Sequence, residues 1–96
     1  MTIAWSPRAI PHLSALRAYI ARDNPDTAAG VALTLLAAVE RLADLPHLGR
    51  PGRLAGTREF VVPGTPYVIP YRVRPERLEI IAVFHQRQQW ITRESR

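Results

Sequence analysis

The sequence predicts an α+β fold in which a helical hairpin packs on one face of an antiparallel sheet. Two observations support this prediction: apolar residues recur every three to four positions over residues 7–45, and they alternate with period two over residues 57–85. The first spacing is that of helices and the second that of strands. With 96 residues the chain has room for a single domain.

The N-terminal element is expected to be a short strand over residues 2–5. Ser6 and Pro7 then predict the start of a helix, because serine caps helices and proline fits their first position. This first helix is expected over residues 7–22. Its apolar stripe consists of Ile10, Leu13, Leu16 and Ile20.

Asn24 and Pro25 repeat the capping pattern and predict a second helix over residues 25–45. Its broad apolar stripe contains Val31, Ala32, Leu35, Leu36, Val39, Leu42 and Ala43. Leu33 lies outside this stripe. An isolated exposed leucine is ordinary on a protein surface, and the alternative is that the hairpin presents apolar surface to a second protein.

Residues 46–56 are rich in glycine and proline and are expected to form a loop. The meander that follows, over residues 57–85, is expected to have strands at 57–62, 67–73 and 78–85, joined by turns short enough for hairpins. On one face of the last strand we expect Leu78, Ile80, Ala82 and Phe84.

Pro70 conflicts with its place in the middle strand, because proline lacks the N–H donor that a central ladder needs. We therefore expect a bulge at Pro70 or an unpaired edge beside it. Residues 86–96 are expected to form a loose C-terminal tail.

The composition is that of a basic globular protein, with a formal charge of +5 and thirteen basic residues that are all arginine. Either codon bias or a basic surface kept for an acidic partner explains this arginine content. The chain has no cysteine, which excludes disulfides and thiolate metal sites and fits a reducing compartment. No signal pattern and no membrane-length apolar run occurs, so the cytoplasm is the expected location.

The familiar patterns of metal and nucleotide sites are absent from the sequence. His12, His47 and His85 lie on different expected elements without metal-binding spacing, so no metal or other cofactor is expected. What remains is a basic and aromatic set over the sheet and its loops: Arg50, Arg53, Arg58, Tyr67, Tyr71, Arg72, His85, Arg87 and Trp90.

Such a set could cleave RNA, if a histidine or carboxylate took the 2′-OH proton and an arginine held the phosphate, or it could simply bind a macromolecule. Each residue also has a plain structural interpretation. For Arg72 this is a solvated outward position, and for Arg58 it is a salt bridge. For Tyr67 and Tyr71 it is packing in the core.

The order of strand, two helices and three strands resembles the ParE/RelE superfamily of bacterial toxins, and its ParE branch in particular. Short stretches that carry the resemblance are Trp-Ser-Pro at 5–7 and residues 19–25, 41–52, 56–59, 67–73 and 80–87, the last containing His85-x-Arg87. Together they extend over nearly the whole chain.

The resemblance implies the toxin of a type II toxin–antitoxin pair, held in a hetero-oligomer by a small acidic antitoxin whose C-terminal segment wraps the hairpin and sheet. The apolar stripe and Leu33 fit such docking, and an acidic partner would also account for the charge of +5. The antitoxin contacts expected from this docking mode are Leu13, Leu16, Ile20, Leu33 and Leu36.

The branch determines the expected target. RelE-like members cut mRNA in the ribosome, with an arginine directly after the first aromatic of the middle strand and a tyrosine near the C-terminus. Here Val68 follows Tyr67, and the nearest C-terminal aromatic is Trp90. His85 and Arg87 match the ParE ending better, and ParE-like members are associated with inhibition of DNA gyrase.

The resemblance therefore favours a non-enzymatic gyrase inhibitor whose target contacts are Arg58, Arg72, His85, Arg87 and Trp90. One alternative is a ribosome-dependent endoribonuclease, with His85 as acid or base and Arg72 or Arg87 holding the phosphate. Another is a homologue that still binds an antitoxin but has lost its activity.

Overall fold

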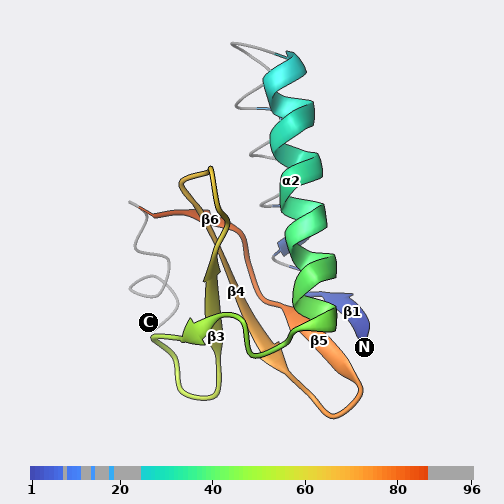
Figure 1. The fold of residues 1–96 in the computed structure, drawn as a ribbon, viewed down its shortest axis with the longest axis vertical. Helices are drawn as coiled ribbons and strands as arrows, with labels where there is room; N and C mark the ends of the chain where they lie inside the picture. Colours follow the sequence, from blue (N-terminus) through green and yellow to red (C-terminus); the bar gives the residue numbers. More distant parts are fainter. Residues whose placement is uncertain (8, 12–13, 15–17, 19–24, 87–96) are drawn as a thin grey trace.

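A computed structural model of the chain describes residues 1–7, 9–11, 14, 18 and 25–86. Within these residues, one face of a six-stranded sheet packs against the long helix α2 (Pro25–Asp44), which extends past the end of the sheet (Figure 1). The strands are β1 (Thr2–Trp5), β2 (Arg50–Pro51), β3 (Arg58–Val61), β4 (Tyr67–Val73), β5 (Arg77–Ile80) and β6 (Phe84–His85). The predicted α+β class is confirmed.

The sheet has the strand order β1-β5-β4-β3-β2, with β6 also paired to β4. β1 runs parallel to β5, so that Ile3 faces Leu78, and the other pairs are antiparallel. The predicted meander therefore forms the centre of the sheet. β2 is a correction, because Arg50 and Pro51 pair with β3 inside the expected loop; a strand of two residues has no alternation from which to predict it.

The turn between β3 and β4 follows directly from its sequence. The Thr65 N–H donates to the Val62 carbonyl at 3.1 Å, and Gly64 has a φ of 78°. Proline followed by a glycine of positive φ is typical of a type II turn, because proline presets the first central residue and glycine alone adopts the second at no steric cost. This turn fixes the register of the hairpin.

A bulge was expected at Pro70 itself, but the extra residue lies on the strand opposite, where it interrupts the last strand of the meander. Tyr71 pairs with Ile80 and Val68 pairs with Phe84, so residues 69–70 of β4 face residues 81–83. The Pro70 carbonyl accepts a hydrogen bond from the Ile81 N–H at 3.0 Å. Since the nitrogen and carbonyl of a strand residue point to the same neighbour, the donor that Pro70 lacks would have faced the bulge, where the ladder is already open.

The bulge overturns the predicted alternation of the last strand. Ile80 and Val83 pack in the core beside α2, whereas Phe84 packs with Val68 in a second cluster. An inserted residue moves every later side chain to the other face. Phe84 therefore lies on the far face, a name we use for the sheet face turned away from α2.

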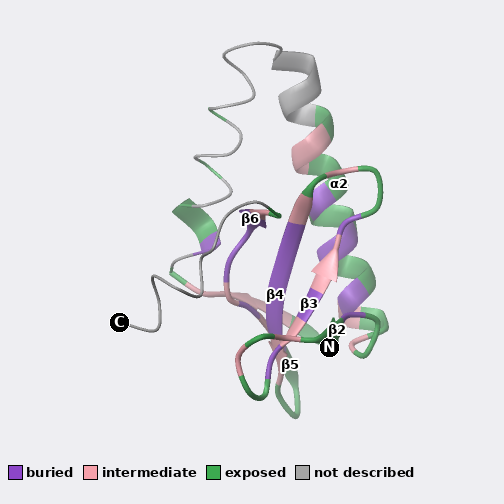
Figure 2. Ribbon diagram, turned by 90° about the vertical axis from the view of Figure 1, so that its left-hand side faces the viewer, coloured by how far each residue is buried: buried purple, intermediate pink, exposed green. Residues whose placement is uncertain are grey.

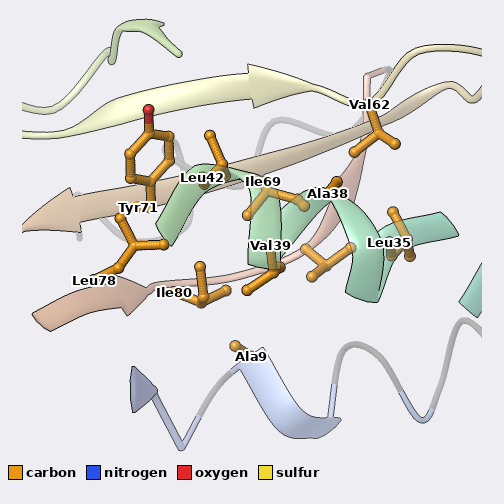
Figure 3. Close-up of a cluster of buried hydrophobic side chains, with 11 residues drawn as sticks. Ala9, Leu35, Ala38, Val39, Leu42, Val62, Ile69, Tyr71, Leu78 and Ile80 are labelled. Atoms are coloured by element: carbon orange, nitrogen blue, oxygen red, sulfur yellow. The ribbon is translucent and has the colours of Figure 1, made fainter. Parts of the chain in front are cut away.

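The main core lies between α2 and the sheet, where side chains from both point toward one another (Figure 3). Helix α2 contributes Leu35, Ala38, Val39 and Leu42, and the strands contribute Val62, Ile69, Tyr71, Leu78 and Ile80. At about 100° per residue, the buried helix positions span a sector of about 100°.

Leu36 lies outside this buried sector and is 41% exposed, although the sequence placed it within the apolar stripe. The sheet covers a narrower part of α2 than the stripe offers. Leu33 is 68% exposed, as its position outside the stripe predicts. The burial colours show buried and exposed residues alternating along α2 (Figure 2).

Ser6 caps the first helix as predicted, since its Oγ accepts a hydrogen bond from the Ala9 N–H at 3.1 Å. The same hydroxyl donates to the carbonyl of Ile81 in the bulge at 2.7 Å. Ala9 is fully buried and Ile10 is 55% exposed, so the predicted place of Ile10 in the packing stripe is wrong. The Ser6 side chain thus links the start of the first helix to the bulge.

Residues 9–11, 14 and 18 are helical, in agreement with the first predicted helix. Leu13, Leu16 and Ile20 lie outside the described residues. Helix α2 ends at Asp44, one residue before the predicted end at Leu45. The predicted tail lies outside the described residues except for Gln86.

Candidate functional site

The outward side of α2 presents apolar side chains at helical spacing. Leu33, Leu36 and Ala37 are all exposed, and positions three and four apart lie on one helix face. The Thr34 hydroxyl is bonded within the helix, because it donates to the Gly30 carbonyl at 2.9 Å. We call Leu33, Leu36 and Ala37 the leucine face; it is suited to an apolar partner helix.

On the far face of the sheet, Glu59 is buried with 2% of its surface exposed. Its Oε1 lies 3.6 Å from Arg50 Nη2 and 3.6 Å from Arg53 Nε, and its Oε2 accepts a hydrogen bond from the Arg53 backbone N–H at 3.1 Å. A buried carboxylate is costly unless it is paired and hydrogen-bonded. These two arginines and one N–H provide that compensation.

The loop between β2 and β3 holds Arg53 beside Glu59. The Gly52 N–H donates to the Thr57 carbonyl at 2.8 Å, and the Thr57 hydroxyl donates to the Leu54 carbonyl at 2.6 Å. The Arg53 guanidinium lies 5.7 Å from the centre of the Phe84 ring, within the range of a cation–π contact. The bulge that moves Phe84 to the far face thus places the ring under Arg53.

A second carboxylate on the far face, Glu79, is more exposed and also holds two arginines. Arg74 Nε donates to its Oε1 at 3.1 Å, and Arg77 Nη2 lies 2.9 Å from its Oε2. The hydrogen bond from Arg74 is the main cause that lowers the pKa of Glu79, and burial opposes it. The positive charges of Arg77 and Arg74 and the hydrogen bond from Arg77 lower the pKa further. Arg72 pairs with Glu79 across the ladder and is half-buried.

Arg58 lies at the α2 side of the sheet and is bonded to the loop after α2. Its Nη1 donates to the Gly49 carbonyl at 2.7 Å and to the His47 carbonyl at 3.4 Å. The salt bridge considered for Arg58 does not form among the described residues; backbone carbonyls take its place. Arg58 was expected to contact a target, and the structure uses part of its guanidinium to hold this loop.

Tyr71 anchors the same loop from the core. Its buried hydroxyl donates to the Pro46 carbonyl at 2.8 Å and accepts from the Gly49 N–H at 2.8 Å. Burial raises the pKa of Tyr71, while the Gly49 N–H and the charge of Arg58 oppose this rise. A Cβ at Gly49 would lie 2.6 Å from the Tyr71 hydroxyl oxygen, so glycine is required there. Packing in the core is the correct interpretation of Tyr71.

His85 lies on the α2 side of the sheet, opposite Tyr67, with the two rings edge to face at 5.6 Å and 86°. Arg72 projects from the far face, as alternation with the core residue Tyr71 requires. Arg72 lies five positions after Tyr67 on β4, which is about 17 Å along the strand. Arg72 and His85 are therefore not brought together.

The other two expected target contacts, Arg87 and Trp90, lie outside the described residues. Within the part of the chain that the structure describes, no group of histidine, cysteine or acidic side chains could hold a metal ion. No helix of the described residues is long and apolar enough to cross a membrane.

Sequence reasoning named Arg50 and Arg53 but missed Glu59, the residue that organises them. Glu59 occupies a position of β3 that reads as solvent-facing, between Arg58 and Phe60. The available signal was the presence of two arginines in the preceding loop, three positions apart, within reach of one strand carboxylate. Only the pairing of Arg50 with Glu59 in the ladder makes that signal specific.

Residues 3–90 match a family described as the ParE toxin of type II toxin-antitoxin system, parDE. The protein of Sinorhizobium fredii named "Putative toxin Y4kP" is 47% identical over 88 residues, which cover 92% of this chain and 91% of that protein. Toxin RelE2 of Caulobacter vibrioides is 36% identical over 83 residues, covering 86% of this chain and 92% of that protein.

The solved structure described as the chromosomal ParDE TA system from P. aeruginosa has the same fold, with a TM-score of 0.78 and 23% identity over 88% of this chain and 95% of that chain. The family match extends over most of the sequence, including α2 and the strands of the sheet. The chain therefore belongs to the ParE toxin family of type II toxin–antitoxin systems.

Proposed function

We propose that this toxin acts by binding and inhibiting DNA gyrase, and that its antitoxin prevents this by covering the leucine face. The observation that carries the first part is the separation of Arg72 from His85 on opposite faces of the sheet. Both candidate targets, gyrase and the ribosome, lie in the cytoplasm, so the toxin would act there.

RNA cleavage needs a proton-transfer group and a phosphate-holding cation at the same phosphodiester. Arg72 and His85 cannot reach one phosphate from opposite faces and opposite ends of β4. Arg58 already donates to two backbone carbonyls, and Val68, which occupies the place of the RelE arginine, is apolar with 1% of its surface exposed. These features favour binding over catalysis.

The second candidate function is ribosome-dependent mRNA cleavage, and one observation favours it. The relative from Caulobacter vibrioides, 36% identical, is named Toxin RelE2. In that function His85 would transfer a proton and Arg87, two residues further on, would hold the phosphate. The active site would then lie at β6 and the residues that follow it.

The two functions are separated by assaying the full-length toxin, freed from its antitoxin, in two reactions. We expect loss of DNA supercoiling by purified gyrase and intact transcripts in a translating ribosome extract. Normal supercoiling with rapid transcript cleavage would replace the first function by the second. Normal growth of cells that express the toxin alone, with neither reaction affected, would mean that this homologue has lost its activity.

For the antitoxin we propose contacts at Leu33 and Leu36 together with Leu13, Leu16 and Ile20. Leu33 is 68% exposed, so Leu33→Asp should change the free energy of unfolding by no more than about 0.5 kcal/mol. Burial of a leucine in an interface contributes about 1.5–3 kcal/mol, so antitoxin affinity should fall about tenfold or more.

The matched control is Leu45→Asp, since Leu45 is 51% exposed but lies beyond the end of α2. Isothermal titration with the cognate antitoxin measures both variants. Equal affinities of Leu33→Asp, Leu45→Asp and the unchanged toxin would remove the leucine face from the interface.

A further inference from the structure

The guanidinium groups of Arg50 and Arg53 are held in place without using their hydrogen-bond donors. Each lies 3.6 Å from Glu59 Oε1, and neither guanidinium donates a hydrogen bond to the residues that the structure describes. A guanidinium carries five N–H donors in a planar fork. The side chains of Arg50 and Arg53 are 58% and 45% exposed, so these donors are open to solvent.

Three other described arginines near the sheet, Arg58, Arg74 and Arg77, differ in this respect. Arg74 and Arg77 lie 3.1 and 2.9 Å from Glu79 oxygens, at hydrogen-bond distance, and Arg58 donates to the loop after α2. Arg50 and Arg53 therefore form a pair whose position is set by charge while its donors remain available. Arg72, on the same face, adds a further positive charge.

The support beneath this pair is rigid. Arg50 is fixed by the ladder between β2 and β3, Arg53 by the hydrogen-bonded loop after it, and Glu59 is buried under both. Phe84 supports the Arg53 guanidinium from below. Arginines that are already ordered lose less conformational entropy when they bind an oxyanion. This arrangement suits a ligand with repeated, fixed negative charges.

We propose that Arg50 and Arg53 bind the phosphate backbone of duplex DNA. The inference rests on the proposed function, because gyrase acts while it holds DNA and a toxin bound to it lies close to phosphates. Two arginine forks on one rigid support match a phosphate backbone. The leucine face offers the antitoxin an apolar surface on α2, on the other side of the sheet, and does not use this pair.

The test is a titration of a short fluorescent duplex with the full-length toxin freed from its antitoxin, followed by anisotropy at several salt concentrations. One lost phosphate contact reduces the slope of log K against log salt by about 1. Arg50→Gln should show this reduction and an affinity about tenfold lower, since a hydrogen bond to a charged group is lost.

Arg77→Gln is the matched control. Arg77 is also a strand residue, its side chain is 56% exposed, and its Nη2 also faces a glutamate. We expect its salt slope to stay that of the unchanged toxin. Equal losses in Arg50→Gln and Arg77→Gln would indicate only the general positive field of the protein and would overturn the proposal, as would an unchanged Arg50→Gln.

Arg50→Lys covers the case in which Arg50→Gln fails to fold. Lysine keeps a charge beside Glu59 but lacks the fork, so the salt slope should stay and the affinity for DNA should fall.

Weaker antitoxin binding by Arg50→Gln with unchanged DNA affinity would assign the pair to an acidic protein segment instead and refute the DNA site. A toxin that inhibits gyrase without binding DNA would refute this inference alone, whereas one that binds DNA through Arg50 and leaves gyrase active would refute only the proposed function.

Discussion

The two faces of the sheet bury polar groups in different ways. On the α2 side, the buried Tyr71 hydroxyl both donates and accepts within the protein, so that its hydrogen-bonding capacity is met internally. On the far face, the buried Glu59 carboxylate is compensated by two arginines that are themselves half exposed. The hydrogen bonds of Tyr71 are made inside the protein, whereas the ion pairs of Glu59 connect a buried charge to arginines at the surface.

This difference indicates that the two faces of the sheet have separate roles. Apolar burial against α2 supplies the stability, because Leu35, Leu42 and Ile69 have no exposed surface. The far face instead contains a buried carboxylate with its ion pairs, and apolar residues of similar volume are often more stabilising than such a group. If the two roles are separate, substitutions on the α2 side should mainly change stability, and substitutions on the far face should mainly change recognition.

The largest effect is expected on the α2 side. Leu42→Ala removes a side chain with no exposed surface and should lower the free energy of unfolding by about 3 kcal/mol. Leu36→Ala, on the same helix but 41% exposed, should lower it by less than about 1 kcal/mol. Urea unfolding monitored by circular dichroism measures both. Similar losses of stability in the two variants would show that the exposed side of α2 contributes as much as its buried side, which would contradict the separate roles of the two faces.

The core face was largely predictable because helix and strand periodicity both point to it. Residues 25–45 and the meander were placed to within a few positions. Leu36 and Ile10 were misplaced, since a stripe on a helix gives the apolar residues but not how much of them a neighbouring sheet covers. The bond from Ser6 to Ile81, which links the start of the first helix to the sheet, is a contact between residues far apart in sequence.

A smaller effect is expected at Glu59 on the far face. Glu59→Gln keeps the shape but removes the charge that holds Arg50 and Arg53, and should lower the free energy of unfolding by about 1–2 kcal/mol. Both arginines can still be solvated, which limits the loss below that of a fully buried pair. If Arg50 and Arg53 bind phosphate, the same variant should also weaken DNA binding. A stability loss as large as that of Leu42→Ala would contradict the division between the faces.

The far face was harder to predict for a physical reason. Pro70 indicated a bulge, but its consequence, the transfer of Phe84 to the face that carries Glu59, depends on which strand takes the extra residue. Glu59 itself looks like an ordinary polar strand position in the sequence. Its burial follows from β2, whose two residues cannot be recognised by periodicity. Arg87 and Trp90, outside the described residues, stay predictions.

The smallest effect is expected at Glu79, where the comparison with Glu59 is most direct. Arg74, through its hydrogen bond, lowers the pKa of Glu79 below its ordinary value of 4.5 in the folded chain. As the pH falls, Glu79 is therefore protonated in the unfolded chain before it is protonated in the folded chain. Its contribution to the free energy of unfolding is complete above pH 4.5 and is lost as the pH falls through the lowered pKa of the folded chain.

Glu79→Gln lacks this titration, so the stability difference between it and the unchanged toxin should shrink as the pH falls below 4.5. Urea unfolding over an acid pH series measures the difference. Because the Glu79 side chain is partly solvated, 1 M salt, with a Debye length of about 3 Å, should also reduce it. If the stability difference persists in acid and in high salt, Glu79 supports the fold in the same way as Glu59. The contrast between the two carboxylates would then be lost.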